Sequence, residues 1–165
     1  MLDLYCGKAG RMYQGIWHEA ESYFGTDKNN PHNLALTARV SAEQASQFFD
    51  LMAFNVFDID CYSSPWRVAR WILRRRGAGR FGIVATVGEY KSLYLGTASE
   101  MIKAAIGARG LSDYRLMERY YDLIIKLMIK SLGDIPGVSL SSGVVARHLT
   151  PMNIMSYFAL TIDKS

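Results

Sequence analysis

The sequence has few of the residues that build disulfide frameworks and metal sites. It contains only two cysteines, Cys6 and Cys61, and their spacing matches no metal-binding pattern. The three histidines, His18, His32 and His148, are scattered along the chain. No run of roughly 18 apolar residues occurs, and no basic stretch followed by an apolar run opens the chain, so we expect neither a membrane span nor a signal peptide. We therefore expect a cytoplasmic protein without a bound metal.

Low-complexity segments are also missing, and the composition is that of a folded domain. Of the 165 residues, 50% are hydrophobic and 21% are charged, which is enough apolar material for one sizeable core. We expect a single domain over residues 1–165. The chain is basic, with a formal net charge of +4 at pH 7, and this balance favours a polyanionic partner such as nucleic acid.

The first residues predict a strand and a turn that bind a nucleotide. An apolar strand carrying Asp3 breaks into a loop with Gly7 and Gly10, and a helical pattern follows over residues 11–21. A second short strand, Tyr23–Asp27, ends in an acid 17 positions after Gly10. This spacing fits a βαβ unit whose second strand offers a carboxylate to ribose hydroxyls.

Two phosphate-binding patterns are incomplete or absent at this turn. Tyr5 stands at the first position of the dinucleotide fingerprint G-x-G-x-x-G, which disfavours NAD, and no G-x-x-x-x-G-K-[ST] sequence occurs. With its two acids and its G-x-x-G turn, the region instead resembles the class I S-adenosylmethionine (SAM) methyltransferases. SAM carries no pyrophosphate, and its positive sulfonium and ammonium groups tolerate nearby carboxylates such as Asp3.

The resemblance implies a cofactor site. In this family the glycine turn packs against the methionine part of SAM, and the acid after the second strand binds the ribose. An acid after the third strand often binds the adenine, and Ser41 or Glu43 stands near that place here. Ser41 could equally cap a helix in a capping box with Gln44. The residues expected to contact SAM are Asp3, Tyr5, Gly7, Gly10, Asp27 and Ser41.

A second motif follows the fourth predicted strand. The segment from Phe54 to Trp66 holds an apolar strand, Val56–Ile59, then Asp60 and a turn that ends at Pro65. Because ligands of open α/β sheets bind at the carboxyl ends of strands, this turn is placed for chemistry. It resembles the D-P-P-Y element of amino-group methyltransferases and, more closely, the D-P-[FY]-G-[ST]-P element of tRNA N2,N2-dimethylguanosine methyltransferases. The matching residues are Asp60, Tyr62, Ser64 and Pro65, whereas Cys61 and Ser63 differ.

The resemblance also implies a mechanism. Asp60 and the backbone carbonyls of the turn would accept hydrogen bonds from the N–H groups of an exocyclic amino group. These bonds would raise the electron density on its nitrogen. Tyr62 would stack on the base, and a base in a duplex would first have to be flipped out. Positioning of the amino nitrogen against the methyl group would supply most of the rate acceleration. Asp60 and Tyr62 are thus the expected catalytic residues. Two alternatives are that Asp60 and Ser64 merely cap the next helix, and that Cys61 attacks a ring carbon, which its acidic neighbour disfavours.

Arginines gather in the helix predicted from Pro65 to Arg76. Arg67, Arg70 and Arg74 are spaced as one stripe of a helix, next to an apolar stripe of Trp66, Ala69 and Leu73. A stripe of this kind suits a phosphate backbone, although a solvated face has the same pattern. The residues expected to bind the substrate are Ser63, Ser64, Pro65, Trp66, Arg67 and Arg70; Arg75, Arg76 and Arg80 lie close by in the sequence.

The remaining pattern alternates strands and helices. Strands are expected at residues 33–39, 81–87, 144–147 and 156–162, and helices at residues 42–52 and 114–132. The apolar face of the last helix is expected to hold Leu116, Tyr120, Leu123, Leu127 and Met128. The order resembles the Rossmann-like, seven-stranded methyltransferase sheet, an α/β fold that is mostly parallel, with an antiparallel last strand and helices on both faces. Relative to the family, we expect no N-terminal helix before the first strand and no target-recognition domain.

These patterns lead to one hypothesis and two alternatives. The hypothesis is a SAM-dependent methyltransferase that modifies an amino nitrogen of a nucleic-acid base in tRNA or DNA. One alternative is methylation of a small molecule or a protein. The other is a non-catalytic subunit of methyltransferase fold that binds nucleic acid or activates a partner. A homodimer or a partner subunit could complete the site, and no membrane partner is expected.

Overall fold

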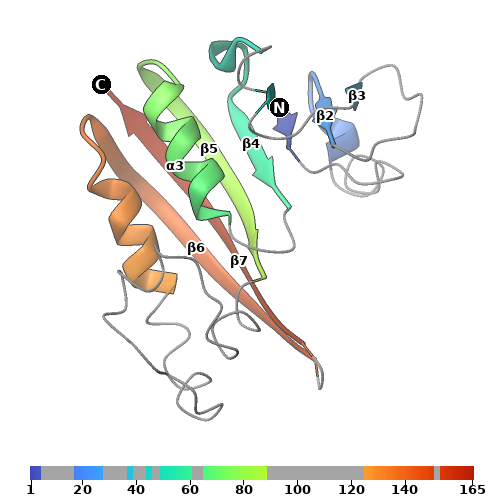
Figure 1. The fold of residues 1–165 in the computed structure, drawn as a ribbon, viewed down its shortest axis with the longest axis vertical. Coiled ribbons are helices and arrows are strands. Elements are labelled where there is room, and N and C mark those ends of the chain that lie inside the picture. The colour runs from blue at the N-terminus through green and yellow to red at the C-terminus, as the bar shows by residue number, and fades with distance from the viewer. Residues whose placement is uncertain are drawn as a thin grey trace.

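A seven-stranded sheet forms the body of the part of the chain that the structure describes. The structure is a computed structural model, and it describes residues 1–4, 17–27, 37–38, 44–45, 49–60, 65–88, 125–150 and 153–165. The strands lie in the order β3-β2-β1-β4-β5-β7-β6 (Figure 1). Their bounds are β1 Leu2–Asp3, β2 Phe24–Thr26, β3 Thr37–Ala38, β4 Val56–Ile59, β5 Gly79–Val87, β6 Val138–Thr150 and β7 Asn153–Lys164.

The directions of the strands confirm the predicted fold class. Strands β1 to β5 are parallel wherever they pair, and β7 is antiparallel to both of its neighbours, β5 and β6. The chain builds the sheet outward from β1 in one direction and from β4 in the other. The point at which the order reverses therefore lies between β1 and β4, and ligands of such sheets bind at the carboxyl ends of the strands beside this point.

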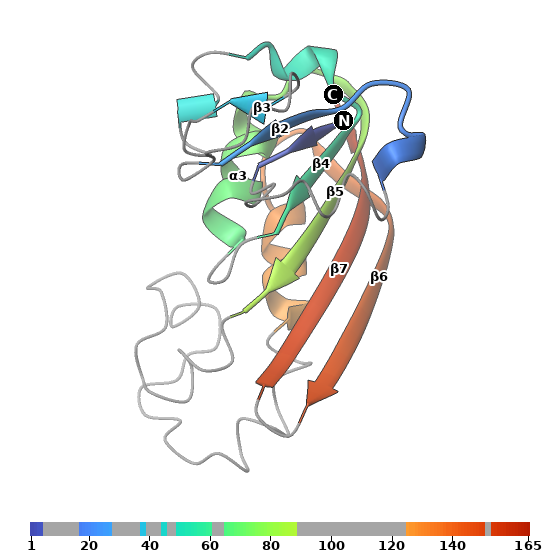
Figure 2. The ribbon, with the colours of Figure 1, turned by 90° about the vertical axis from the view of Figure 1, so that its right-hand side faces the viewer.

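Two helices cover the same face of the sheet. Helix α3 (Trp66–Arg75) lies over β4 and β5, and a second helix over residues 125–133 lies over β6 and β7 (Figures 1 and 2). The 3-10 turn η1 (Trp17–Glu19) lies on the opposite side of β1 (Figure 2). The remaining predicted helical positions between residues 5 and 16, 39 and 43, and 114 and 124 lie outside the described residues.

Helix α3 follows the amphipathic pattern that its sequence predicts. It begins after Pro65 and ends where Arg76 takes an extended conformation, and Gly77 then leads toward β5. Arg67, Arg74 and Arg75 are exposed, and Arg70 is half-buried. The side chains that face the sheet are Trp66, Val68, Ala69, Ile72 and Leu73.

The hydrophobic core lies between α3 and the sheet. Phe57, Ile59, Ile83 and Ala85 alternate along β4 and β5 and are fully or almost fully buried. Trp66 stacks on Phe158 of β7, with ring centroids 5.0 Å apart and ring planes 9° apart. Full burial of a large apolar side chain contributes roughly 1.5–3 kcal/mol, so this stack fixes the start of α3 on the sheet.

Two of the predicted helices differ from the structure. The described end of the pattern over residues 11–21 is the 3-10 turn η1, followed by bends. The helix predicted over residues 42–52 does not reach its expected end, because Asp50 caps a separate 3-10 turn, η2 (Leu51–Ala53), by accepting a hydrogen bond from the Met52 N–H at 2.9 Å. A side chain that captures backbone N–H groups in this way competes with an α-helix.

The apolar face predicted for the last helix is wrong at one position. In the described part of this helix Ile125, Met128 and Leu132 are buried, whereas Leu127 is 37% exposed. Residues at i, i+3 and i+7 share a face, and Leu127 lies off that stripe. Lys126 and Lys130 are exposed. Leu116, Tyr120 and Leu123 lie outside the described residues.

The last two strands form a hairpin that is longer than the sequence predicts. β6 and β7 pair from Val138 opposite Lys164 to Thr150 opposite Asn153, with one irregularity between Leu140 and Ser142. The sequence patterns capture only the middle of each strand. Cross-strand pairing extends the ladder through serines and threonines that a hydrophobic pattern overlooks.

Candidate functional site at the carboxyl ends of the central strands

Asp3 and Asp58 lie opposite one another at the point where the strand order reverses. Asp3 of β1 pairs with Asp58 of β4, and the Leu4 N–H donates to the Asp58 carbonyl at 2.9 Å just beyond the strand. Residues that pair in a sheet share a face, so both side chains lie on the face opposite α3. Asp3 is fully buried and Asp58 is 2% exposed. Two adjacent carboxylates thus occupy the centre of the sheet.

The carboxylate of Asp3 has a partner from the neighbouring strand. The Tyr23 hydroxyl, just before β2, donates to Asp3 Oδ2 at 2.8 Å in a buried setting. A hydrogen bond to a charged group stabilises that group more than a neutral bond does, and it offsets part of the cost of burial. Asp3 therefore ties β1 to β2 inside the fold, and its contact with SAM stays a prediction.

Asp27 and Asp60 extend this row of acids along the same edge. Asp27 follows β2 directly, Asp60 follows β4 directly, and both are half-buried. Since β1 lies between these two parallel strands and neighbouring strands are about 4.8 Å apart, the row spans on the order of 10 Å. Half-buried carboxylates at such an edge are accessible acceptors for hydroxyl or amino groups of a ligand.

Asp58 is a buried acid for which the sequence alone predicts no role. It stands inside β4, and no local pattern shows that it faces Asp3, which lies 55 positions earlier in the chain. The available signal was an acid within an apolar strand, because a buried carboxylate needs a compensating partner or a ligand. Both acids belong to the architecture of the candidate site.

Several residues predicted for the site lie outside the described part of the chain. They are Tyr5, Gly7, Gly10, Ser41, Tyr62, Ser63 and Ser64. The glycine turn after β1 and the polar turn between Asp60 and Pro65 therefore stay predictions. The structure does fix the two strands from which these turns depart, and it brings those strands together.

The prediction that Trp66 contacts the substrate is corrected by its position. Trp66 is fully buried and stacks on Phe158, so its ring belongs to the core. Pro65 is buried beside it. The apolar stripe of Trp66, Ala69 and Leu73 is confirmed, because all three face the sheet. In the described residues the buried Trp66 indole N–H has no hydrogen-bond partner.

The arginines of α3 separate into an exposed set and one buried residue. Arg67, Arg74 and Arg75 are exposed, and the Arg75 guanidinium lies 5.6 Å from the centre of the Trp71 ring. Arg76 is only 3% exposed and lies over the Phe81 ring at 5.2 Å. Its guanidinium also donates to the carbonyls of Gly77 and Ala78, both at 3.3 Å.

Arg76 is therefore a structural residue that holds the turn between α3 and β5, and it leaves the basic group predicted from the sequence. We use the name basic face for the arginines that remain on α3, namely the exposed Arg67, Arg74 and Arg75 and the half-buried Arg70. Arg80, further along, is exposed and lies 3.6 Å from Asp163.

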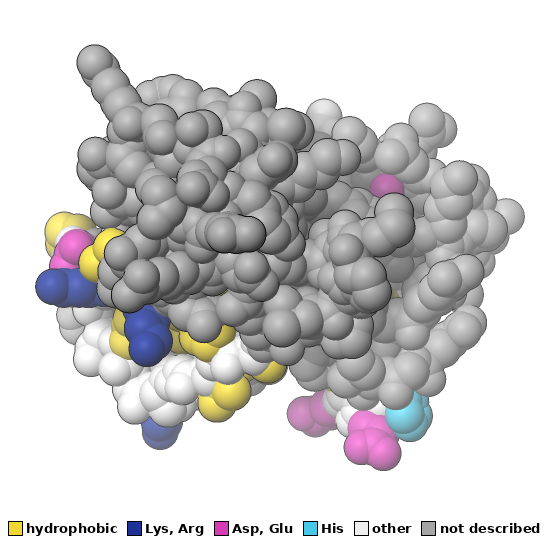
Figure 3. Space-filling view, turned by 90° about the horizontal axis from the view of Figure 1, so that it is seen from below, with side chains coloured by type: hydrophobic (Ala, Val, Ile, Leu, Met, Phe, Trp, Pro, Cys, Tyr) yellow, Lys and Arg dark blue, Asp and Glu magenta, His cyan; other side chains and the backbone are white. Residues whose placement is uncertain are grey.

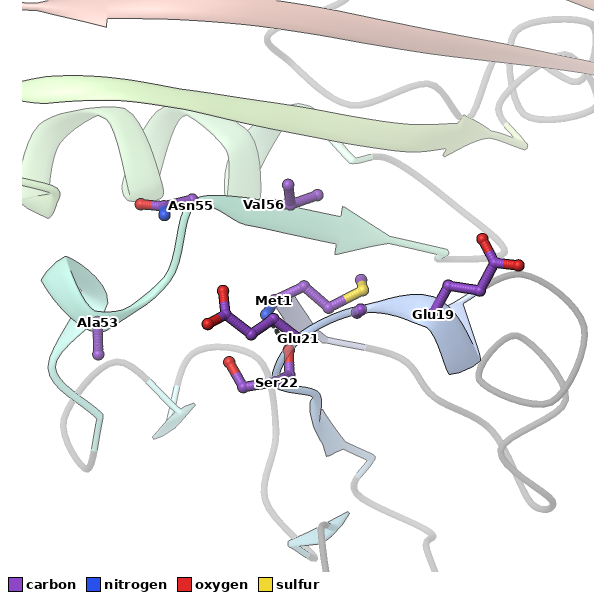
Figure 4. Close-up of a pocket in the computed structure, with 8 residues that line it drawn as sticks. Met1, Glu19, Glu21, Ser22, Ala53, Asn55 and Val56 are labelled. Atoms are coloured by element: carbon purple, nitrogen blue, oxygen red, sulfur yellow. Dashed lines mark hydrogen bonds between the residues drawn. The ribbon is translucent and has the colours of Figure 1, made fainter.

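A cavity of about 420 Å³ lies at the opposite end of the strands. Asn55 and Val56 at the start of β4 line it, together with Met1 and Glu19 to Ser22 (Figure 4). The Met1 ammonium group donates to the Ser22 carbonyl at 2.5 Å, and burial lowers the pKa of this group below its ordinary value. The cavity is at the amino ends of β1 and β4, so it is separate from the candidate site.

The described residues hold no group of three metal-ligating side chains. Among the same residues, no helix is long and apolar enough to cross a membrane. At the carboxyl edge the described residues form a row of acids, and helix α3 with its basic face begins beside this row.

Comparison with known proteins supports the fold. No protein-family model and no curated protein match the chain. A candidate O-methyltransferase from Klebsiella pneumoniae is similar in structure, with a TM-score of 0.58 and 12% identity over 98% of this chain and 72% of that one. The N-methyltransferase NodS from Bradyrhizobium japonicum WM9 has a TM-score of 0.54 and 8% identity over 99% and 85%.

A third structure is a candidate methyltransferase from Streptococcus mutans in complex with S-adenosylhomocysteine (SAH). It has a TM-score of 0.47 and 14% identity over 99% of this chain and 84% of that one. The first two similarities show that the chain has the fold of these methyltransferases. Together with the strand order and the antiparallel β7, they establish the α/β methyltransferase architecture.

Proposed function

We propose that the protein is a SAM-dependent methyltransferase that transfers a methyl group to an amino nitrogen of a nucleic-acid base. The observation that carries the proposal is the position of Asp60. It follows β4 directly, beside the point where the strand order reverses, and seven residues later Arg67 opens the basic face of α3. A hydrogen-bond acceptor, Asp60, and a cation, Arg67, thus lie close together in the chain at the edge where ligands of this fold bind.

The described acids fit the cofactor. Asp27 is half-buried at the end of β2, where its carboxylate can accept hydrogen bonds from the two ribose hydroxyls. Asp3 and Asp58 add two carboxyl groups in the nearby sheet centre. When bound, SAM supplies an electrophilic methyl group on its sulfonium.

Asp60 would act on the acceptor. Its carboxylate would accept a hydrogen bond from an N–H of the target amino group. This bond would orient the nitrogen lone pair toward the methyl group and increase the electron density on the nitrogen. The amino proton is released after the carbon–nitrogen bond forms, and a carboxylate at this position can take it up. Because Asp60 is only half-buried, it can reach both the solvent and a bound base.

The basic face supports a polyanionic substrate. Helix α3 starts at the carboxyl edge and runs back along the sheet, so Arg67 lies closest to Asp60. Arg74 and Arg75 lie about 10 Å further along at 1.5 Å per residue. A phosphate backbone could follow this line of cations while one base reaches the edge.

The test is transfer of a labelled methyl group from SAM to tRNA, to single-stranded DNA and to duplex DNA. We expect one of these acceptors to be labelled on an exocyclic amino nitrogen, and we expect Asp60→Ala to remove the label. Transfer to none of them by a protein that binds SAH would reject the nucleic-acid substrate. That result would direct the search to small molecules and proteins as acceptors.

A further inference from the structure

The outer edge of β6 is open over residues 141–146. β6 is the last strand in the sheet order, and among the described residues it pairs with β7 alone, so its other side presents backbone N–H and C=O groups. Residues 141–146 are all exposed. Because successive side chains of a strand point to opposite faces, this run shows that neither face of the strand is covered there.

The exposed part of β6 is apolar as well as open. Val144 is 67% exposed and Val145 is 40% exposed, although they point to opposite faces. Tyr157 on the adjoining β7 is 38% exposed. Three of the five large hydrophobic side chains that are exposed in the described residues therefore lie on this one hairpin. Figure 3 shows hydrophobic side chains at the surface on the β6–β7 side of the molecule.

The usual protection of an edge strand is largely absent from this one. Residues 138–146 contain no charged residue and no proline, and these are the devices that normally prevent edge-to-edge pairing. One irregularity between Leu140 and Ser142 interrupts the strand near its start. Beyond it the ladder with β7 is regular from Ser142 to Thr150, which leaves an edge without further irregularities for another strand.

We propose that the β6 edge, defined as residues 142–146, pairs antiparallel with the β6 edge of a second copy of this chain. An uncharged strand can meet an identical strand without repulsion, and a two-fold axis perpendicular to the sheet makes the contact self-complementary. A register centred at Val144 or Val145 places valine against valine. It also keeps Arg147 away from its own copy, because Arg147 then faces Ser141 or Gly143.

The proposed dimer has a defined consequence for the candidate sites. The two seven-stranded sheets join into one continuous sheet, with both α3 helices on the same side. The two-fold axis reverses the strand direction, so the two carboxyl edges point to opposite ends of the dimer. Each site would therefore be built by one chain, and the proposal stands or fails independently of the proposed function.

The test is the mass of the protein in solution, measured by sedimentation or light scattering over a range of concentrations. We expect the wild type to reach twice the mass of one chain at tens of micromolar, with a concentration-dependent equilibrium. Val144→Lys should weaken the association at least about tenfold, because like charges brought together across an interface cost several kcal/mol. Val144 is exposed, so the variant should keep the wild-type unfolding transition.

Two control variants separate the edge from other surfaces. Leu127→Lys changes an exposed hydrophobic residue of the helix over residues 125–133 and should leave the dimer intact. Tyr157→Lys changes the face of the sheet but not its edge and should have little effect. A wild type that stays monomeric at about 100 µM would overturn the proposal, because even a weak dimer would be populated at that concentration. Dissociation by Tyr157→Lys but not by Val144→Lys would also overturn it, since stacking of sheet faces would then hold the copies together.

Discussion

The centre of the sheet buries acidic side chains, whereas its β6 edge exposes apolar ones. In the centre, Asp3 and Asp58 are carboxylates that are almost completely buried. At the edge, Val144 and Val145 are apolar side chains that are exposed. A buried carboxylate costs free energy unless it is hydrogen-bonded, and an exposed apolar patch costs free energy unless something covers it.

Both departures from the usual hydrophobic pattern indicate interaction, although of different kinds. The central acids lie beside the carboxyl ends of parallel strands, where this fold binds small ligands. The apolar edge lies far from the strands that carry the acids, at the end of the strand order, where another strand can pair. Four variants test this difference between the centre and the edge.

The largest expected effect is on stability, from loss of the core contact that fixes α3. Trp66→Ala should lower the free energy of unfolding by about 3–5 kcal/mol, because it removes a fully buried aromatic ring that stacks on Phe158. Val145→Ala at the exposed edge should change it by less than about 0.5 kcal/mol. Denaturant unfolding at low protein concentration measures both. Similar values for the two variants would contradict the division into core and edge.

The next effect is on catalysis at the carboxyl edge. Asp60→Ala should reduce methyl transfer about 100-fold or more, because misplacement of a reacting group costs a factor of this size. The affinity for SAH should stay near that of the wild type, since Asp60 is assigned to the acceptor. Single-turnover transfer and calorimetric titration measure the two quantities. Equal losses in both would mean that Asp60 binds the cofactor or supports the fold.

A smaller effect is expected at the hydrogen bond that holds Asp3. Tyr23→Phe removes the hydroxyl that donates to Asp3 Oδ2 and should cost about 1.5–3 kcal/mol of stability, the usual range for a bond to a charged group. Tyr157→Phe is the matched control, because the Tyr157 side chain is exposed on β7. Thermal unfolding of both variants gives the comparison. No loss in Tyr23→Phe would show that the bond contributes nothing to the sheet centre.

The smallest effect concerns the basic face of α3. Arg74→Gln should weaken binding of tRNA or DNA a few-fold and reduce the slope of log affinity against log salt by about one. Lys130→Gln, on the exposed side of the helix over residues 125–133, should leave both unchanged. Filter binding or fluorescence anisotropy across salt concentrations provides the measurement. Equal effects of the two variants would mean that binding follows net charge rather than the basic face.

Much of the fold could be predicted from the sequence, because local patterns record it. β4 begins at Val56 and ends at Ile59 as predicted, since polar residues bound a short apolar run on both sides. The face of α3 is also correct, because one stripe of apolar residues stands against one of arginines. The helix over residues 125–133 shows the limit of this method: both Leu127 and Met128 are apolar, and only the packing decides which is buried.

The candidate site could be predicted only in part. The sequence identified the acids that follow β2 and β4, because a strand that ends in an acid is a local feature. It could not show that Asp58 faces Asp3, since that pairing depends on the register of strands distant in the chain. The substrate role predicted for Trp66 is wrong. Trp66 belongs to the apolar stripe of α3, and this stripe packs in the core.

Calorimetric titration of the purified protein with SAH tests whether the carboxyl edge binds SAM. We expect micromolar binding that Asp27→Ala removes, because Asp27 follows β2 at the edge where the ribose is expected. Asp134→Ala, which changes an exposed acid beyond the helix over residues 125–133, should bind SAH as the wild type does. No binding of SAH by the folded wild type would contradict the assignment of this edge as a SAM site.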